Sequence, residues 1–157
     1  MSLLVKDLMA ADVLCIPSTS TVAEATQLLR EHGVNGAPVV DATGKPIGVV
    51  SRTDLLSGCV QAEVERQRVY YRSASGELPG APTNDLVPAF GQQRVSEIMM
   101  SLVFSVQKDD PVRKAAELMA IEGIHRLIVL DGTRLVGILS ASDLVQAVAK
   151  GLLVPSA

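Results

Sequence analysis

The heptapeptide GILSASD at residues 137–143 has a close counterpart, GVVSRTD, at residues 48–54. Both copies consist of Gly, two aliphatic residues and Ser, followed by two further residues and Asp. Aliphatic residues directly after a glycine favour a short buried strand. Ser-x-x-Asp ahead of an apolar run is typical of a helix N-terminus. The sequence therefore predicts, at two places, a strand that runs straight into a helix.

The polar residues of the heptapeptides allow two interpretations. Ser51 and Ser140 can be N-caps, with Asp54 and Asp143 as their capping-box partners, each box contributing roughly 1 kcal/mol. Alternatively, the free N–H groups and the dipole of the helix N-terminus can bind a phosphate, while an aspartate accepts hydrogen bonds from ribose hydroxyls. A single copy favours the cap, whereas two copies inside longer repeats favour the nucleotide site.

The heptapeptides belong to an extended internal repeat. Shifting the sequence by 90 residues superimposes apolar, glycine and acidic positions, and after a one-residue deletion a shift of 89 aligns the heptapeptides. Such extended register indicates an internal duplication. The matched pairs include Val5 with Val95, Met9 with Met99, Ala25 with Ala115, Gly33 with Gly123 and Asp41 with Asp131.

Each repeat predicts a β-α-β-β-α order of elements. A capping box of Thr21 and Glu24 is expected to open the first long helix, and Pro111 after Asp110 is expected to occupy the first helical position of its counterpart. In the first repeat, the predicted elements before the heptapeptide are a short amphipathic element over Val5–Met9, a strand over Val13–Ile16, a helix over Val22–Glu31 and a strand over Ala37–Val40.

Two further features complete this prediction. Gly33 and Gly123 are expected to end the long helices as C-terminal glycines, and a strand over Leu127–Leu130 is expected in the second repeat. The apolar face predicted for the first helix consists of Val22, Ala25, Leu28 and Leu29.

Composition narrows the class of protein. The chain has 157 residues, enough for one domain or two small ones, and its 48% hydrophobic but 3% aromatic content predicts a core of Val, Leu, Ile, Ala and Met. A net charge of −3 gives no reason to expect nucleic acid or an acidic membrane as partner. Two cysteines suggest neither a disulfide framework nor a zinc ribbon. With no signal-like or membrane-spanning apolar run, a soluble cytoplasmic protein is expected.

The repeat resembles the CBS domain, named for cystathionine β-synthase, and the chain looks like a pair of such domains. The resemblance covers about Val5–Ser57 and Val95–Lys150. It implies an α/β (α+β) fold of two β-α-β-β-α repeats packed about a pseudo-two-fold axis. The expected boundaries are 1–57 for the first repeat, 58–94 for an insert, 95–150 for the second repeat and 151–157 for a tail.

The resemblance also implies a ligand. In the family, two clefts between the repeats bind adenosyl compounds such as AMP, ADP, ATP or S-adenosylmethionine. Carried over to this sequence, Asp54 and Asp143 hold the ribose, while Ser51 and Ser140 lie beside ribose or phosphate. The apolar residues expected to enclose the adenine, together with strand backbone, are Val13, Ala37 and Pro38 in the first repeat and Val103 and Ile128 in the second.

The second repeat is also similar to the regulatory γ subunit of AMP-activated protein kinase, through HRLIVLD at residues 125–131 and the heptapeptide that follows. That similarity implies that His125 and Arg126 contact ligand phosphate. The plainer interpretation is a packed imidazole and a solvated surface cation. The first repeat departs from the pattern with Asn35 and Gly36, and its own basic candidate is Arg52, where the second repeat has Ala141.

The insert belongs to neither repeat. A helical stripe predicts that the helix begun at Thr53 can continue to Arg72, and residues 73–88 read as an irregular loop. Three of the four aromatic residues, Tyr70, Tyr71 and Phe90, lie in this insert. They suit either a cover packed on the insert's own domain or a partner surface, and the sequence does not distinguish the two.

No arrangement typical of catalysis or of a metal site is found in the sequence. The leading hypothesis is therefore a non-enzymatic sensor of adenine nucleotides that acts in trans on an unknown partner protein, without nucleic acid or membrane. A ligand-free oligomerisation scaffold and an enzyme are the alternatives. The resemblance further implies a homodimer packed through helical faces, with Leu144, Val145 and Val148, and Leu55 and Leu56, as candidate contacts.

Overall fold

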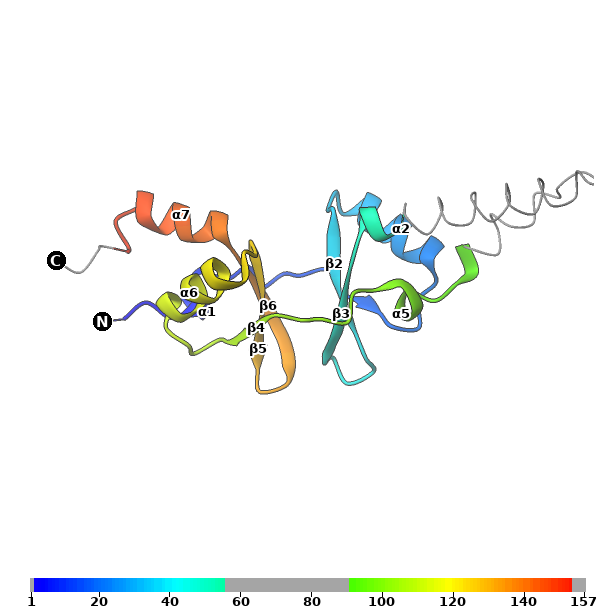
Figure 1. The fold of residues 1–157 in the computed structure, drawn as a ribbon, viewed down its shortest axis with the longest axis horizontal. Coiled ribbons are helices and arrows are strands. Elements are labelled where there is room, and N and C mark those ends of the chain that lie inside the picture. The colour runs from blue at the N-terminus through cyan, green and yellow to red at the C-terminus, as the bar shows by residue number, and fades with distance from the viewer. Residues whose placement is uncertain (1, 56–90, 154–157) are drawn as a thin grey trace, which may run out of the picture. The chain divides into compact units, whose positions relative to one another are not determined.

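The computed structural model describes residues 2–55 and 91–153, which form two three-stranded sheets with the strand orders β1-β2-β3 and β4-β5-β6 (Figure 1). The predicted mixed α/β fold is confirmed. The elements of the first half are α1 (Val5–Leu8), β1 (Ile16–Pro17), α2 (Val22–Glu31), β2 (Gly36–Val40) and β3 (Pro46–Ser51). Those of the second half are α5 (Val95–Ile98), β4 (Ser105–Gln107), α6 (Val112–Glu122), β5 (Arg126–Asp131), β6 (Arg134–Ser140) and α7 (Ala141–Ala149).

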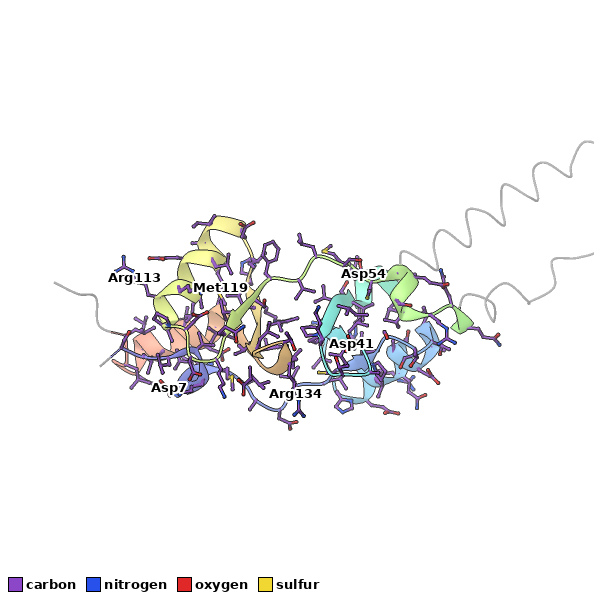
Figure 2. The ribbon with its side chains drawn as sticks, turned by 90° about the horizontal axis from the view of Figure 1, so that it is seen from below. Asp7, Asp41, Asp54, Arg113, Met119 and Arg134 are labelled. Atoms are coloured by element: carbon purple, nitrogen blue, oxygen red, sulfur yellow. The ribbon has the colours of Figure 1, made fainter. Side chains whose placement is uncertain are left out.

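The second sheet has one face on an apolar core. β4 runs parallel to β5, and β5 pairs antiparallel with β6 in a register that joins Leu127 to Leu139. Side chains alternate between the faces of a strand, so Leu127, Val129 and Leu139 all reach the same core, where they meet Ala115 and Met119 of α6. In Figure 2, Arg113 lies on the outer side of α6, where its guanidinium pairs with Glu117 at 2.8 Å. The amphipathic α6 thus covers the core face of the sheet.

The strand predicted over Val13–Ile16 is wrong in its bounds, because β1 comprises Ile16 and Pro17. Ile16 pairs in parallel with Val39, a register that would bring the preceding residue opposite Pro38. Proline has no N–H to donate, so the ladder stops there. At the corresponding place in the second sheet Ile128 donates its N–H to the Phe104 carbonyl at 3.0 Å, and β4 is one residue longer.

The helix ends follow local chemistry with one correction. The capping box of Thr21 and Glu24 is present, with hydrogen bonds of 2.8 and 3.2 Å, and Gly33 and Gly123 follow their helices with φ of 64°. Pro111, however, is the N-cap of α6 and not its first helical residue. The reason is its extended ψ of 140°, which leaves Val112 to begin the helix.

The short segment that begins each repeat packs with the sheet of the other repeat. We call residues 3–10 the first arm and residues 93–100 the second arm. The first arm groups with residues 102–157 and the second with residues 15–40 and 47–101. In Figure 1, α1 accordingly lies beside α6 and α7, and α5 lies in the same unit as α2. The sequence repeat and the compact unit are therefore made of different residues.

Backbone hydrogen bonds fasten both arms in the same way. In the first arm, the Val5 N–H donates to the Asp110 carbonyl at 2.9 Å, and Ala10 and Ile138 exchange two bonds of 2.9 Å. In the second arm, the Val95 N–H donates to Ser20 at 2.9 Å. Both arm valines are fully buried, so each arm contributes a core side chain to the sheet that it joins.

Several expectations fall outside the described residues. They are the continuation of the helix from Thr53 to Arg72, the loop over 73–88, the placement of Tyr70, Tyr71 and Phe90, and that of Leu56. Among the helices of residues 2–55 and 91–153, none is long and apolar enough to cross a membrane.

Candidate functional site

The second heptapeptide folds as a strand end joined to a capped helix. Ser140 ends β6 and is the N-cap of α7. Its backbone N–H and its hydroxyl both donate to Oδ2 of Asp143, at 2.7 and 2.6 Å, and the Asp143 N–H donates back to Ser140 Oγ at 3.3 Å. The predicted cap is confirmed. Within the described residues, Oδ1 of Asp143 has no hydrogen-bond partner, so one carboxylate oxygen stays available to a ligand.

The first heptapeptide has nearly the same geometry. Oδ2 of Asp54 accepts from the Ser51 N–H at 2.7 Å and from its hydroxyl at 2.8 Å, and the Asp54 N–H donates to Ser51 Oγ at 3.2 Å. Figure 2 shows Asp54 next to the end of β3. Over residues 2–55 and 91–153, Oδ1 of Asp54 likewise has no hydrogen-bond partner. Both repeats thus present a half-buried Ser-Asp pair with one free acceptor.

The arms explain why each heptapeptide begins with glycine. A Cβ on Gly137 would lie 2.9 Å from the Ala10 carbonyl oxygen and 2.6 Å from the Met9 sulfur. A Cβ on Gly48 would meet the Met100 carbonyl oxygen at 2.9 Å and would come closer still to the Met99 sulfur. Both glycines therefore serve close approach of an arm, a role that analysis of the heptapeptides alone did not identify. The sequence signal that could have pointed to this role is the alignment of Met9 with Met99 in the repeat.

Arg126 lies beside the second Ser-Asp pair. It is the first residue of β5 and the direct cross-strand partner of Ser140. Cβ atoms of such a pair lie about 4.5–5.5 Å apart on one face of the sheet. Arg126 is exposed, and within the described ranges it has no carboxylate partner. Its guanidinium can therefore reach a ligand held by Asp143.

His125 is tied to the same place through its backbone. Its carbonyl accepts the N–H of Ala141, the first residue of α7, at 2.9 Å, and its imidazole is exposed. The structure therefore brings His125, Arg126, Ser140 and Asp143 together at one end of the second sheet.

The corresponding place in the first repeat has no room for an arginine. Gly36 lies opposite Ser51, and a Cβ on Gly36 would be 2.9 Å from the Val50 carbonyl oxygen and 3.7 Å from Ser51 Cβ. At this distance from the Val50 carbonyl, a side chain on Gly36 would require a shift of the backbone. Arg52 is exposed at the start of the following helical turn, and its N–H donates to the Asn35 carbonyl at 2.9 Å. The lack of an Arg126 counterpart is thus a property of the backbone as well as of the sequence.

The residues predicted to enclose the adenine are not all equivalent. Ile128 lies two residues along β5 from Arg126 and hence on the same face as Ser140, and Pro38 has the matching place in β2. Both are buried, whereas Val13 and Val103 are half-buried ahead of the first strand of each sheet. Ala37 alternates to the opposite face from Pro38, so it can offer this site only its backbone.

Charged groups cluster at the first arm. Lys6 Nζ lies 2.7 Å from Oδ1 of Asp109, and the pKa of Asp109 is lowered mainly by this hydrogen bond. Lys114 lowers the pKa of Asp110 in the same manner, and Asp131 raises the pKa of Lys108 through a bond of 2.6 Å. Each of these three ion pairs includes one of residues 108–110, so we assign them a structural role in the segment that precedes α6. In the described part of the chain, no group of three or more His, Cys, Asp or Glu side chains could hold a metal ion.

Comparison with known proteins supports the assignment of the repeat. The family model of the CBS domain matches residues 5–60 and 95–150. A CBS domain-containing protein of Dictyostelium discoideum is 30% identical, covering 97% of this chain and 95% of that protein. An uncharacterised protein of Methanopyrus kandleri is 29% identical over 86% of this chain, which spans 57% of that protein's length.

Further matches include the kinase subunit and solved structures. The γ-3 subunit of human 5′-AMP-activated protein kinase is 25% identical over 87% of this chain, which covers 24% of that protein. CBSX2, solved in complex with AMP, superimposes with a TM-score of 0.69 at 25% identity, covering 96% of this chain and 98% of its own. A CBS domain pair solved with 5′-methylthioadenosine and S-adenosyl-L-methionine has a TM-score of 0.67 at 23% identity, covering 96% and 99%.

Proposed function

The chain belongs to the CBS domain family, and on that premise we propose that it is a regulatory module that binds an adenosyl ligand at the Ser-x-x-Asp element of each repeat. The observation that carries the proposal is the free Oδ1 of Asp143 beside Arg126, an acceptor and a cation at the same end of one sheet. CBSX2 was solved with AMP, which supports an adenine nucleotide as the ligand.

The chemistry of the second site suits a phosphorylated nucleoside. Oδ1 of Asp143 can accept a ribose hydroxyl, because Oδ2 already takes both donors of Ser140. Arg126 can then bind the phosphate with two N–H groups of its fork, and His125 can add a donor. Ile128 and the strand backbone offer an apolar place for the adenine. In the first site, Asp54 and Pro38 correspond to Asp143 and Ile128, and Arg52 is the cation nearest in sequence.

We place the regulation in trans. On this proposal the chain is a cytoplasmic, non-enzymatic sensor that signals the adenosyl ligand to a separate protein, and it works as a homodimer. Val145 and Val148 support the dimer because they are 68% and 58% exposed on α7. Leu55 does not belong to such a surface, because it is 5% exposed. Leu144 is half-buried and packs partly against the core, so its part in the dimer stays a prediction.

The capping geometry itself favours a second candidate, a ligand-free scaffold. Ser51 and Ser140 form their hydrogen bonds with Asp54 and Asp143 of the same turn. Thr21 and Glu24 form the same kind of capping box at a place where no ligand is proposed. If the heptapeptides were caps only, the carboxylates would stabilise helices and bind nothing.

That third capping box supplies the matched control for the test. Asp54→Ala, Asp143→Ala and Glu24→Ala each remove the third-position partner of a capping box, so each is expected to cost about 0.5–2 kcal/mol of unfolding free energy. Titration calorimetry with adenosine and AMP should show loss of binding in the two Asp variants and wild-type affinity in Glu24→Ala. Equal affinity in all three would support the scaffold.

Two measurements identify the ligand and check the absence of catalysis. Mass spectrometry of the denatured, purified protein should release an adenosyl compound. Incubation with ATP followed by chromatography should return the ATP unchanged. Formation of ADP or AMP that disappears in Asp143→Ala would contradict the non-enzymatic assignment.

A further inference from the structure

Each arm places a methionine sulfur against the glycine of a heptapeptide. The Met9 sulfur lies 2.6 Å from where a Cβ of Gly137 would be, and the Met99 sulfur takes the same position at Gly48. The residue after each methionine is bound to the strand that leads to the Ser-Asp pair. Ala10 exchanges bonds with Ile138, and Met100 exchanges bonds with Val49, all at 2.9 Å.

The described methionines differ in their access to solvent. Met119 is 6% exposed in the core, and Met100 is 56% exposed. Met9 and Met99 lie between these limits and are half-buried. They are the two whose sulfur contacts the backbone of another segment at a glycine. Each side chain is thus partly open to solvent, and an atom added to the sulfur on its glycine side would have to displace the arm.

We propose that Met9 and Met99 are oxidation sites through which a peroxide detaches the arms from the heptapeptide strands. A lone pair of the thioether sulfur attacks one oxygen of hydrogen peroxide, a sulfur–oxygen bond forms as the oxygen–oxygen bond breaks, and water leaves after proton transfer. The sulfur loses two electrons and the peroxide gains them. The product, methionine sulfoxide, is polar, and methionine sulfoxide reductases reverse its formation.

Steric and polar effects of the sulfoxide act in the same direction. The glycine side of the contact is filled by the backbone of Gly137 or Gly48, so the new oxygen has no free volume there. A sulfoxide oxygen also loses its hydration on burial. The N–H groups of Ala10 and Ile138 cannot serve as its donors, because they are already bonded to each other's carbonyls, and those of Val49 and Met100 are paired in the same way. Detachment restores hydration and separates the paired backbones. This inference does not depend on the ligand proposed above.

Hydrogen exchange of the full-length protein tests the proposal. Peptide mass mapping after hydrogen peroxide treatment should show one added oxygen on Met9, Met99 and the exposed Met100. The N–H groups of Ala10, Ile138, Val49 and Met100 should then exchange about tenfold faster or more, the order expected from burying one unpaired polar group. The N–H of Ile128, bonded to Phe104 in the same sheet as Ile138, is the reference that should not change.

Matched variants separate the arm methionines from the exposed one. Met100→Leu should behave like wild type after peroxide, and the double variant Met9→Leu/Met99→Leu, which conserves side-chain volume, should show no acceleration. Treatment of oxidised wild type with methionine sulfoxide reductases should restore slow exchange, a readout that needs no variant to fold. The proposal is overturned if Met9 and Met99 stay unoxidised while Met100 reacts, or if their oxidation leaves exchange unchanged. Equal acceleration in the double variant would also overturn it.

Discussion

Replacing Arg126 with alanine should separate recognition of phosphate from recognition of adenosine. Arg126 is paired across the strands with Ser140, and it has no carboxylate partner among the described residues. Its backbone is fixed by the buried Leu127 on one side and by β6 on the other, so binding a phosphate mainly costs the ordering of one side chain. The substitution removes an exposed group and leaves the core face of β5 untouched.

The expected magnitude follows from the exposure of the guanidinium. A hydrogen bond to a charged group contributes about 1.5–3 kcal/mol, whereas exposed ion pairs contribute about 0–1 kcal/mol. Arg126 is exposed, but binding would shield one side of it, so we take the lower end of the first range. About 1.5 kcal/mol corresponds to roughly tenfold in affinity. Arg126→Lys, which keeps the charge without the planar fork, should lose less than Arg126→Ala.

Titration calorimetry with AMP and with adenosine measures this difference. In wild type, the second site should bind AMP at least about tenfold more tightly than the first, because Gly36 offers no cation. Arg126→Ala should weaken AMP by that factor at one site and leave adenosine nearly unchanged. Two equal sites, unaffected by Arg126→Ala, would refute the reasoning. Equal weakening of AMP and adenosine would show instead that Arg126 positions the strand.

Three further results are expected. Gly137→Ala should destabilise the fold by about 1–3 kcal/mol through its clash with the first arm. Gly123→Ala, with open space but a φ of 64°, should cost about 1–2 kcal/mol through backbone strain alone. Urea unfolding measures both, and a loss clearly below about 1 kcal/mol in Gly137→Ala would contradict the steric argument. The bond to Lys6 lowers the pKa of Asp109 in the folded protein from its ordinary value of 3.8. The ion pair therefore stabilises the fold fully at pH values above 3.8, and this contribution is lost as the pH falls through the lowered pKa of the folded state. The melting temperatures of wild type and Asp109→Asn should accordingly converge in acid. Sedimentation equilibrium should show a dimer that Val148→Asp weakens, and a wild-type monomer at tens of micromolar would remove the dimer proposal.

The features that sequence analysis predicted correctly are those set by local chemistry. Thr21 with Glu24, and each Ser-Asp pair, form capping boxes because the two residues stand three apart and need nothing distant. Apolar periodicity likewise placed α2 and the strands of each hairpin. The duplication then transferred each assignment from one repeat to the other.

The features that it missed depend on distant partners. Periodicity shows that the arm around Val5 has an apolar face but not which sheet that face joins. The shortening of β1 required the register that would bring the residue before Ile16 opposite Pro38. Leu55 was expected on a helical face that packs against a second copy, yet it is buried. The missing space at Gly36 is visible only once β2 and β3 are placed side by side.

The exchange of the arms has a consequence for synthesis on the ribosome. After Ser51 leaves the exit tunnel, the first sheet still lacks Val95, a fully buried side chain of its core. At about 5–20 residues per second, the ribosome needs several more seconds to supply it. The first arm, in turn, is made before β6 and has to wait for that strand before it can dock. A nascent chain that stops between the repeats therefore holds one sheet without its arm and one arm without its sheet, and it exposes the apolar surface that Val95 and Val5 would otherwise help to bury.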